Sequence, residues 1–360
     1  MIDYMFYRNM GEENIQSMYD SSMDTGDLFE MVRAHRSKLA HVDQLETTNT
    51  CNLKCVMCPR GRDNHMTRPI QPMENVLFHR IIDQINEAEE EKASQGIDRK
   101  DFLSNPPSSL VWPGSEYDVC ALRLHHFGSP MLDPDMLERV EYIKSNTRLV
   151  IQFSETIINL KLREVRELFR MGLDRLIIGL DGTNAEEFEA SRGVKVANFD
   201  AMIHRVHDII EAKLKLGDRT KLDVQIIQMR HSPQDSFLRE WDSVEGVNVH
   251  MKPFFPYPDV PHDLVTENDT VFRRNCRIPF TSLSIMTDGR VVPCNSDYNG
   301  EHVFGDLNHQ SLQDIWDCPE VIEFCRHFLF DLFDKDALCN RCGFYPHYKE
   351  EQTAELPTIP

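Results

Sequence analysis

Between residues 43 and 255 the sequence repeats one pattern, a short apolar run followed by an amphipathic stretch of helical length. This alternation predicts parallel βα units, because a helix must connect each buried strand to the next and cover the sheet. Strands are expected over 41–48, 121–127, 149–153, 175–179, 222–228 and 247–253. The sequence therefore predicts an α/β protein with six parallel units, too few for a closed eight-unit barrel.

The remaining elements are helices and loops. Helices are expected over 74–92, 133–145, 160–171, 199–216 and 234–243, and also over 27–35 and 310–330. The helix over 133–145 should have Asp133 as its N-cap and Pro134 as its first residue. Segment 93–118 is rich in proline and aromatic residues and is expected to be a folded insert. The predicted organisation is an extension (1–42), a core (43–255) and a C-terminal domain (256–360).

The overall charge limits the partners of the chain. Its formal net charge is −20, which argues against nucleic acid because phosphate binding needs a basic surface. No apolar run approaches the ~20 residues of a membrane span, and no basic segment followed by an apolar one opens the chain. Ten cysteines without an export signal indicate a reducing compartment and metal sites. We therefore expect a cytoplasmic metalloprotein.

Three cysteines, Cys51, Cys55 and Cys58, lie in one loop directly after the first expected strand. Parallel barrels carry their chemistry at this end of their strands. Thiolates bind iron well, and an iron–sulfur cube normally takes one cysteine on each iron, so three ligands would leave the fourth iron open. A zinc knuckle or a buried apolar role is the alternative interpretation.

The spacing of these cysteines, with three and then two residues between them, resembles the signature of the radical S-adenosylmethionine (radical SAM) superfamily. The resemblance implies a partial (β/α)6 TIM barrel and a [4Fe–4S] cluster whose open iron is chelated by S-adenosyl-L-methionine. It also implies reductive cleavage of SAM to a 5′-deoxyadenosyl radical that abstracts a substrate hydrogen. An electron donor such as flavodoxin or ferredoxin is then required.

Further segments resemble the SAM-binding motifs of the superfamily in the expected order. Gly128 and Ser129 stand where the family carries Gly-Gly-Glu-Pro, so an uncharged serine replaces the glutamate that would accept a hydrogen bond from the SAM amine. An arginine such as Arg192 would pair with the SAM carboxylate. The resemblance thus implies SAM contacts at Met57, Gly128, Ser129, Ser154, Asp181, Arg192 and Gln225. For Ser154 and Gln225, an ordinary strand-end role is an equal alternative.

A second cysteine group lies near the C-terminus, at Cys276, Cys294, Cys339 and Cys342. A glycine five residues before Cys294 and the final Cys-x-x-Cys resemble the SPASM/twitch extension of radical SAM enzymes. No cysteine follows Cys342, which favours the shortened twitch form with one auxiliary [4Fe–4S] cluster. Structural zinc is the alternative. The other cysteines, Cys120, Cys318 and Cys325, are expected to be core residues.

When four cysteines ligate a cube, no iron is left open to bind the substrate. The auxiliary cluster is therefore expected to accept an electron. The architecture is most similar to the twitch-bearing aminocyclitol dehydrogenase of butirosin biosynthesis. We therefore expect an oxidoreductase that acts on a small polar alcohol, with an epimerase or a peptide-modifying enzyme as the alternative. Asp297 is a candidate catalytic base. The preferred alternative is that Asp297 caps a turn with Asn299 and Gly300.

Overall fold

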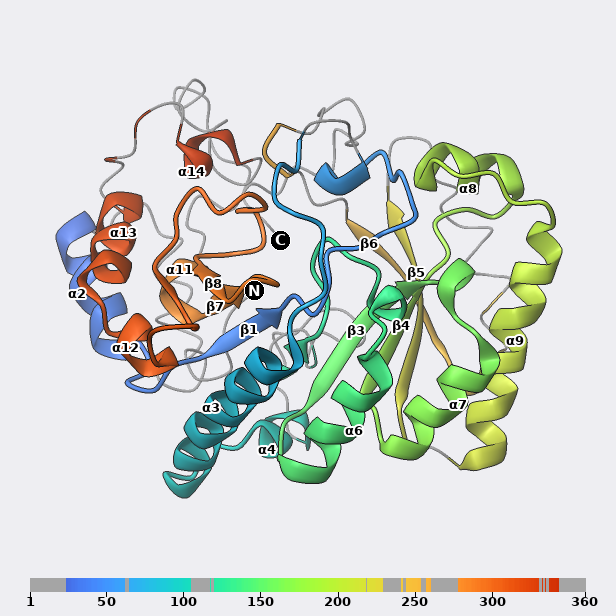
Figure 1. Ribbon diagram of the computed structural model, residues 1–360, viewed down its shortest axis with the longest axis horizontal. Helices are drawn as coiled ribbons and strands as arrows, with labels where there is room; N and C mark the ends of the chain where they lie inside the picture. Colours follow the sequence, from blue (N-terminus) through green and yellow to red (C-terminus); the bar gives the residue numbers. More distant parts are fainter. Residues whose placement is uncertain are drawn as a thin grey trace.

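The computed structural model in Figure 1 describes residues 24–61, 65–104, 117, 120–217, 219–228, 241, 244–253, 257–259, 278–329, 332, 334 and 337–342. Its strands are β1 (Val42–Leu45), β2 (Leu122–Arg123), β3 (Ile151–Thr156), β4 (Arg175–Gly179), β5 (Lys221–Gln228), β6 (Asn248–Pro253), β7 (Leu283–Ile285), β8 (Arg290–Val292) and β9 (Gly305–Asp306). They form one sheet in the order β6-β5-β4-β3-β2-β1-β7-β8-β9. All pairs from β1 to β6 are parallel, which confirms the predicted α/β class and its six units.

Helices cover one side of this sheet. Along the outside of the strands from β1 to β5 lie α3 (Asn75–Ser94), α6 (Met136–Asn146), α7 (Leu162–Met171) and α9 (Phe199–Leu216) (Figure 1). The others are α2 (Thr25–His35), α4 (Arg99–Ser104), α8 (Ala185–Arg192), α11 (Ile278–Thr281), α12 (Leu312–Trp316), α13 (Pro319–Leu329) and α14 (Leu338–Arg341). Short 3₁₀ turns are η1 (Pro59–Gly61), η2 (Pro130–Leu132) and η3 (Ile157–Asn159).

The two faces of the barrel strands differ in polarity. On β3, Ile151 and Phe153 join the apolar core beneath the helices. Because successive side chains of a strand point to opposite faces, Gln152 lies on the inner face. There the Arg175 guanidinium donates to the Gln152 amide oxygen at 3.0 Å and pairs with Asp223, and all three side chains are buried. Buried polar side chains therefore form one layer inside the partial barrel.

The first predicted strand is longer than the observed one. Strand β1 ends at Leu45 rather than at residue 48. The Glu46 amide still donates to the Ile285 carbonyl of β7 at 2.9 Å, but the backbone groups after it bond to another segment. The Met73 amide donates to the Thr47 carbonyl at 2.7 Å, and the Asn49 amide donates to the Gln71 carbonyl at 3.3 Å. The chain thus leaves the sheet shortly before the cysteine loop.

Two helix predictions are corrected by the structure. The helix expected over 133–145 begins at Met136, because the Asp133 carboxylate caps the preceding turn through the Asp135 amide and pairs with Arg139 at 3.1 Å. The helix expected over 310–330 is two helices, α12 and α13. They separate just before Pro319, since a residue that precedes proline is disfavoured in helical conformation. The expected helix over 234–243 lies almost wholly outside the described residues.

The C-terminal segment extends the barrel sheet. Strand β7 pairs in parallel with β1, and β8 and β9 follow in antiparallel order. Helix α2 of the N-terminal segment lies beside α13 (Figure 1). The Arg36 guanidinium stacks 3.7 Å from the Trp316 ring centroid, and the Trp316 indole donates to the Ser37 carbonyl at 2.9 Å. The sheet thus runs across the predicted domain boundary at residue 255, and the boundary itself stays a prediction.

Within the part of the chain described here, no helix has both the length and the apolar character needed to cross a membrane.

A buried ion cluster lies near the start of β1, where α3 and α4 meet. The Glu89 carboxylate contacts the Lys92 ammonium at 2.7 Å and the Arg99 guanidinium at 2.7 Å, and each of these residues is less than 5% exposed. Burial opposes ionisation of Glu89, but the two cations hold its pKa well below the usual range. Burial, together with Arg99 and Lys92, lowers the pKa of His41 to about 3, so His41 is neutral.

The Glu89→Gln variant should lose about 3–5 kcal/mol of folding stability, because it leaves two buried cations without their anion. Glu87→Gln on the exposed face of α3 is the matched control and should change stability by less than about 0.5 kcal/mol. Urea unfolding under anaerobic conditions measures both variants. Equal midpoints for the two would show that the cluster does not stabilise the fold.

Candidate functional site

The cysteine loop lies at the carboxyl end of the parallel strands, directly after β1. Its backbone is anchored to the end of α8, where the Lys54 amide donates to the Arg192 carbonyl at 3.1 Å and the Val56 amide donates to the Ser191 carbonyl at 3.0 Å. Gly193 allows this approach, because a Cβ there would lie 2.2 Å from the Lys54 carbonyl oxygen. The loop conformation is therefore set by α8 as well as by its own sequence.

All three cysteines of the loop belong to one small cluster. Cys55 is buried, Cys51 and Cys58 are half-buried, and they pack with Leu53 and Met57. Burial raises the pKa of Cys51, and burial together with the Cys55 and Cys51 charges raises the pKa of Cys58 to about 12. Three thiols so close together can lose their protons only if a positive group lies beside them.

One such group is Arg192. Its guanidinium donates to the Cys55 sulfur at 3.4 Å and pairs with the buried Asp181 carboxylate. Burial alone would lower the pKa of Arg192, but Asp181 and Cys55 raise it above its usual value. Asp181 is held in turn by the Ile227 amide, which donates to its carboxylate at 2.6 Å. Asp181 and Arg192, predicted as SAM contacts, therefore lie beside the cysteines as an ion pair.

The donor set of the loop fits an iron–sulfur cube. Three soft thiolates are present, with a cation beside them. Among the described residues, no three His, Cys, Asp or Glu side chains converge as they would on a single metal ion. A cube places its cysteines on separate irons, so its ligands need not converge on one point.

The segment after β2 lies against the cysteine loop. A Cβ on Gly128 would lie 2.0 Å from the Thr48 carbonyl oxygen, so only glycine permits this approach. The Ser129 amide donates to the Thr50 carbonyl at 2.8 Å. The Ser129 hydroxyl donates to the carboxylate of Glu155, at the end of β3, at 2.6 Å. Sequence reasoning did not select Glu155, although it directly follows Ser154.

The other two predicted SAM contacts lie on strands. Ser154 is half-buried on β3, and its amide donates to the His125 ring at 3.2 Å. Gln225 is 7% exposed on β5, where its carbonyl accepts the Leu180 amide at 3.0 Å. These described contacts are those of ordinary strand residues, so the two SAM contacts stay predictions.

The second cysteine group is partly described. Cys294 follows β8 and Cys342 follows α14, and both meet Ser296: its amide donates to the Cys294 sulfur at 3.4 Å, and its hydroxyl lies 3.6 Å from the Cys342 sulfur. Cys339 lies on α14 and packs at the edge of the main core. Cys276 lies outside the described residues. Of the cysteines predicted to be core residues, Cys120 and Cys325 are buried and Cys318 is half-buried.

Tyr257 interacts with both cysteine groups. Burial raises its pKa, and the charges of Cys58, Cys294 and Cys342 raise it further. Its ring packs edge-on against Phe127, with ring centroids 5.4 Å apart. The two groups of thiols thus face one region of the molecule, although the cysteine loop and Cys342 are far apart in sequence.

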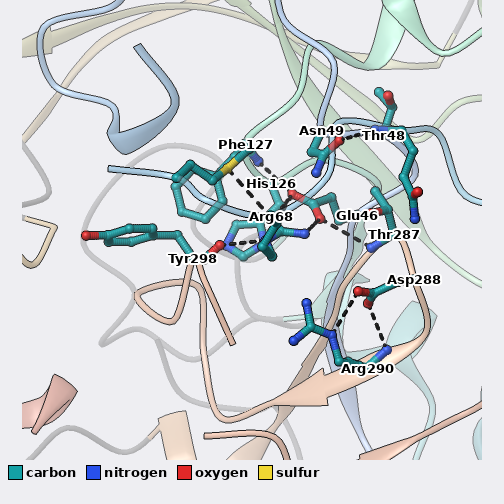
Figure 2. A network of polar contacts seen from close by, with 12 residues as sticks. Glu46, Thr48, Asn49, Arg68, His126, Phe127, Thr287, Asp288, Arg290 and Tyr298 are labelled. Carbon is teal, nitrogen blue, oxygen red and sulfur yellow. Dashed lines mark hydrogen bonds and ion pairs between the residues drawn. The ribbon is translucent and has the colours of Figure 1, made fainter. Parts of the chain in front are cut away.

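A buried ion pair connects the segments that carry the two groups (Figure 2). Glu46, fully buried, receives two hydrogen bonds from the Arg68 guanidinium at 2.8 and 2.9 Å. The Thr287 amide donates to the same carboxylate at 3.2 Å, and Arg68 Nε donates to the Tyr298 carbonyl at 2.6 Å. Next to it, His126 contacts the Asn295 carbonyl at 3.0 Å, and burial lowers its pKa to about 4.

Asp297, the candidate base, is fully buried. Its two carboxylate oxygens accept the Glu301 amide at 2.7 Å and the His302 amide at 2.8 Å. Burial raises the pKa of Asp297. These contacts favour the alternative interpretation, in which Asp297 caps the turn that contains Asn299 and Gly300.

Comparison with known proteins identifies two domains in the chain. Residues 45–220 match the model of the radical SAM superfamily, and residues 276–343 match SPASM, an iron–sulfur cluster-binding domain. A curated relative, the S-adenosyl-L-methionine-dependent 2-deoxy-scyllo-inosamine dehydrogenase of Niallia circulans, is 28% identical over 78 residues. The alignment spans 22% of this chain and only 31% of the relative.

Solved structures share the fold at low identity. BtrN in complex with AdoMet and 2-DOIA has a TM-score of 0.51 at 15% identity, with 84% of this chain and 93% of BtrN covered. Native anSMEcpe with bound AdoMet has a TM-score of 0.55 at 11% identity, covering 84% and 90%. Streptococcus suis SuiB bound to the precursor peptide SuiA has a TM-score of 0.51 at 13% identity, covering 92% and 74%.

Each matched domain contains one of the two cysteine groups. The chain therefore carries a radical SAM domain followed by a SPASM-type iron–sulfur cluster-binding domain.

Proposed function

We propose that this enzyme oxidises an alcohol carbon of a small polar molecule, such as a sugar or an aminocyclitol, to a carbonyl. The observation that carries the proposal is the position of Tyr257, which packs against the cluster of the cysteine loop and whose pKa is raised by the charges of Cys294 and Cys342. A substrate beside Tyr257 would lie near both sites. Forming a carbonyl removes a hydrogen atom, then a proton and an electron, which suits two redox sites that face one space.

We assign Cys51, Cys55 and Cys58 as ligands of the SAM-binding cluster. The ligands proposed for one auxiliary [4Fe–4S] cluster are Cys276, Cys294, Cys339 and Cys342. When bound, these groups supply a hydrogen-abstracting 5′-deoxyadenosyl radical and an electron acceptor. The residues around them have supporting roles: Arg192 balances the Cys55 charge, Met57 packs beside the loop, and Gly128 allows the segment after β2 to approach.

The polarity of the barrel interior supports a polar substrate. Arg123 influences the pKa of Tyr257, so its charge lies close to the region between the two cysteine groups. Arg123 pairs with Asp43 at 2.6 Å, and both side chains are nearly buried. The polar layer around Arg175 lies on the same inner face of the sheet. A hydroxylated molecule can exchange hydrogen bonds with polar groups of this kind, whereas an apolar one cannot.

The curated relative acts on 2-deoxy-scyllo-inosamine by its name, which makes this aminocyclitol the first substrate to test. SuiB bound to a peptide shares the fold, so fold alone does not separate a small alcohol from a peptide. An epimerase or a peptide-modifying enzyme is therefore the alternative. We further propose flavodoxin or ferredoxin as the electron donor, and the cytoplasm as the compartment, because thiolate-ligated clusters need reducing conditions.

Replacing Cys51, Cys55 and Cys58 together with alanine should abolish reductive SAM cleavage, because no cluster can then form in the loop. The auxiliary iron should remain bound. Dithionite-driven release of 5′-deoxyadenosine by the reconstituted protein is the measurement. The Cys318→Ala variant, outside both groups, is the control and should keep the wild-type rate. Cleavage by the triple variant at that rate would show the assignment to be wrong.

Anaerobic iron analysis should give about eight irons per chain, which is two cubes of four. Replacing Cys276, Cys294, Cys339 and Cys342 with alanine should leave about four irons, all in the loop cluster. The reference is the variant in which the three loop cysteines are replaced, which should also keep about four irons. About four irons with stoichiometric zinc in the wild type would support a structural zinc site instead.

The wild-type enzyme should convert 2-deoxy-scyllo-inosamine, or a related alcohol, into a product two mass units lighter, as expected for loss of two hydrogens. The variant without the auxiliary cluster should still cleave SAM in part but should form no oxidised product, since the electron has no acceptor. Mass spectrometry in deuterated water measures both reactions. A product that gains solvent deuterium without being oxidised would favour an epimerase and reject this proposal.

A further inference from the structure

Arg341 lies inside the C-terminal Cys-x-x-Cys motif and joins two other segments of the chain. Its guanidinium donates to the Asp259 carboxylate at 2.6 Å and to both oxygens of the Glu301 carboxylate at 2.6 Å. Glu301 belongs to the turn after Cys294, where its amide is held by the buried Asp297 carboxylate. One arginine of the motif thus connects the turn after Cys294 with the segment that follows β6.

Asp259 has a backbone conformation that few residues other than glycine adopt. Its φ is 63°, in the left-handed region. Such a conformation persists where the surrounding contacts hold it. Two contacts meet at the Asp259 carboxylate, one from the Arg341 guanidinium and one from the Tyr298 hydroxyl, which donates at 3.2 Å. Both partners belong to the SPASM-type domain, so the conformation of Asp259 depends on that domain.

Tyr257, in the same short segment as Asp259, packs against the cysteine loop. It contacts the apolar cluster that the loop cysteines form with their neighbours. Its ring meets Phe127 edge-on with centroids 5.4 Å apart, and Phe127 meets the Tyr298 ring in the same way at 5.9 Å. The segment 257–259 therefore connects the two cysteine groups: Tyr257 rests on the first, and Asp259 is tied to the motif of the second.

The tie to Arg341 holds only while the Cys-x-x-Cys motif is itself in place. Helix α14, which ends at Arg341, has four residues, and a helix this short has little stability of its own. Ligation of a cluster by Cys339 and Cys342, as proposed above, would fix this segment at both cysteines. Because Glu301 also holds the guanidinium, a further hydrogen bond to Asp259 then costs little conformational freedom.

We propose that Arg341 positions Tyr257 through Asp259, and that the place of Tyr257 thereby depends on the Cys-x-x-Cys motif. When Cys339 and Cys342 hold the auxiliary cluster, the same motif holds the tyrosine against the cysteine loop. Arg341 and Asp259 are positioning residues, because they act through Tyr257. The auxiliary site thus shapes the space in which the substrate is proposed to lie. The inference rests on the proposed cluster ligands and is independent of the proposed oxidation.

Hydroxyl-radical footprinting of the reconstituted protein, read by mass spectrometry, measures how accessible the Tyr257 side chain is. It needs neither SAM nor a substrate, so failure of the proposed oxidation leaves its result readable. In Arg341→Gln, Tyr257 should be oxidised about threefold faster than in the wild type, the effect of losing a partly exposed ion pair on a local opening. Asp259→Asn should give the same increase, because asparagine tolerates the left-handed backbone but carries no charge.

The controls separate this role from a general loss of stability. Arg341→Lys keeps a charge for Asp259 and should restore most of the protection of Tyr257. The double variant Arg341→Gln with Asp259→Asn should show no larger increase than either single variant, because both remove one interaction. Arg170→Gln, which breaks an exposed ion pair with Glu167 on α7, should match the wild type. Unchanged oxidation of Tyr257 in Asp259→Asn would overturn the proposal.

The dependence on the motif is tested by replacing Cys339 and Cys342 together with alanine. Tyr257 should then be oxidised as fast as in Asp259→Asn, and adding Asp259→Asn to the cysteine variant should change nothing further. Asp259→Asn alone should keep about eight irons. A lower iron content there would count against the proposal, because the ion pair would then serve the cluster and not the tyrosine. Wild-type oxidation of Tyr257 in the cysteine variant would reject it, since Arg341 would hold its place without the cluster.

Discussion

The buried ion pair between Glu46 and Arg68 is the interaction on which the arrangement of the two sites depends. Glu46 lies between β1 and the cysteine loop, and Arg68 lies after that loop. The Thr287 amide also donates to Glu46, and Arg68 donates to the Tyr298 carbonyl. The pair thus ties the barrel to the segments before and after Cys294 (Figure 2). A fully buried carboxylate is stable only when its cation stays in place. This pair of charges therefore holds the barrel against the segments on both sides of Cys294, together with the parallel pairing of β7 with β1.

The cysteine loop has a positive and a negative neighbour. Arg192 and its partner Asp181 lie against Cys55, while Glu155 acts on Cys51. The pairing of Arg192 with Asp181 also fixes the guanidinium, so little conformational freedom is lost when an anion approaches it. The charges of the site are in this way arranged before any ligand binds.

Much of the fold was predictable where local signals are strong. Helix α9 was expected over 199–216 and has those bounds, because Asn198 caps its first turn and Gly217, at φ 60°, ends it. Strand β4 was likewise expected over 175–179, since its apolar run has clear ends. Prediction failed where a specific side-chain or backbone contact, local or distant, decides the boundary of an element. The Asp133 carboxylate bonds to the Asp135 amide and pairs with Arg139 instead of starting a helix, and backbone bonds to 71–73 end β1 early.

The sequence by itself determined the donor types and their spacing: three thiols in one loop after a strand, a serine in place of a glutamate, and six strand–helix units. These features are local, so a linear pattern can record them. Only the tertiary structure decided which distant groups meet. Ser129 and Glu155 are separated by 26 residues, and Arg68 and Tyr298 by 230. Closing such loops costs entropy that is repaid only by packing of the whole core, so the pairing of these side chains follows from the fold and is not written in either segment alone.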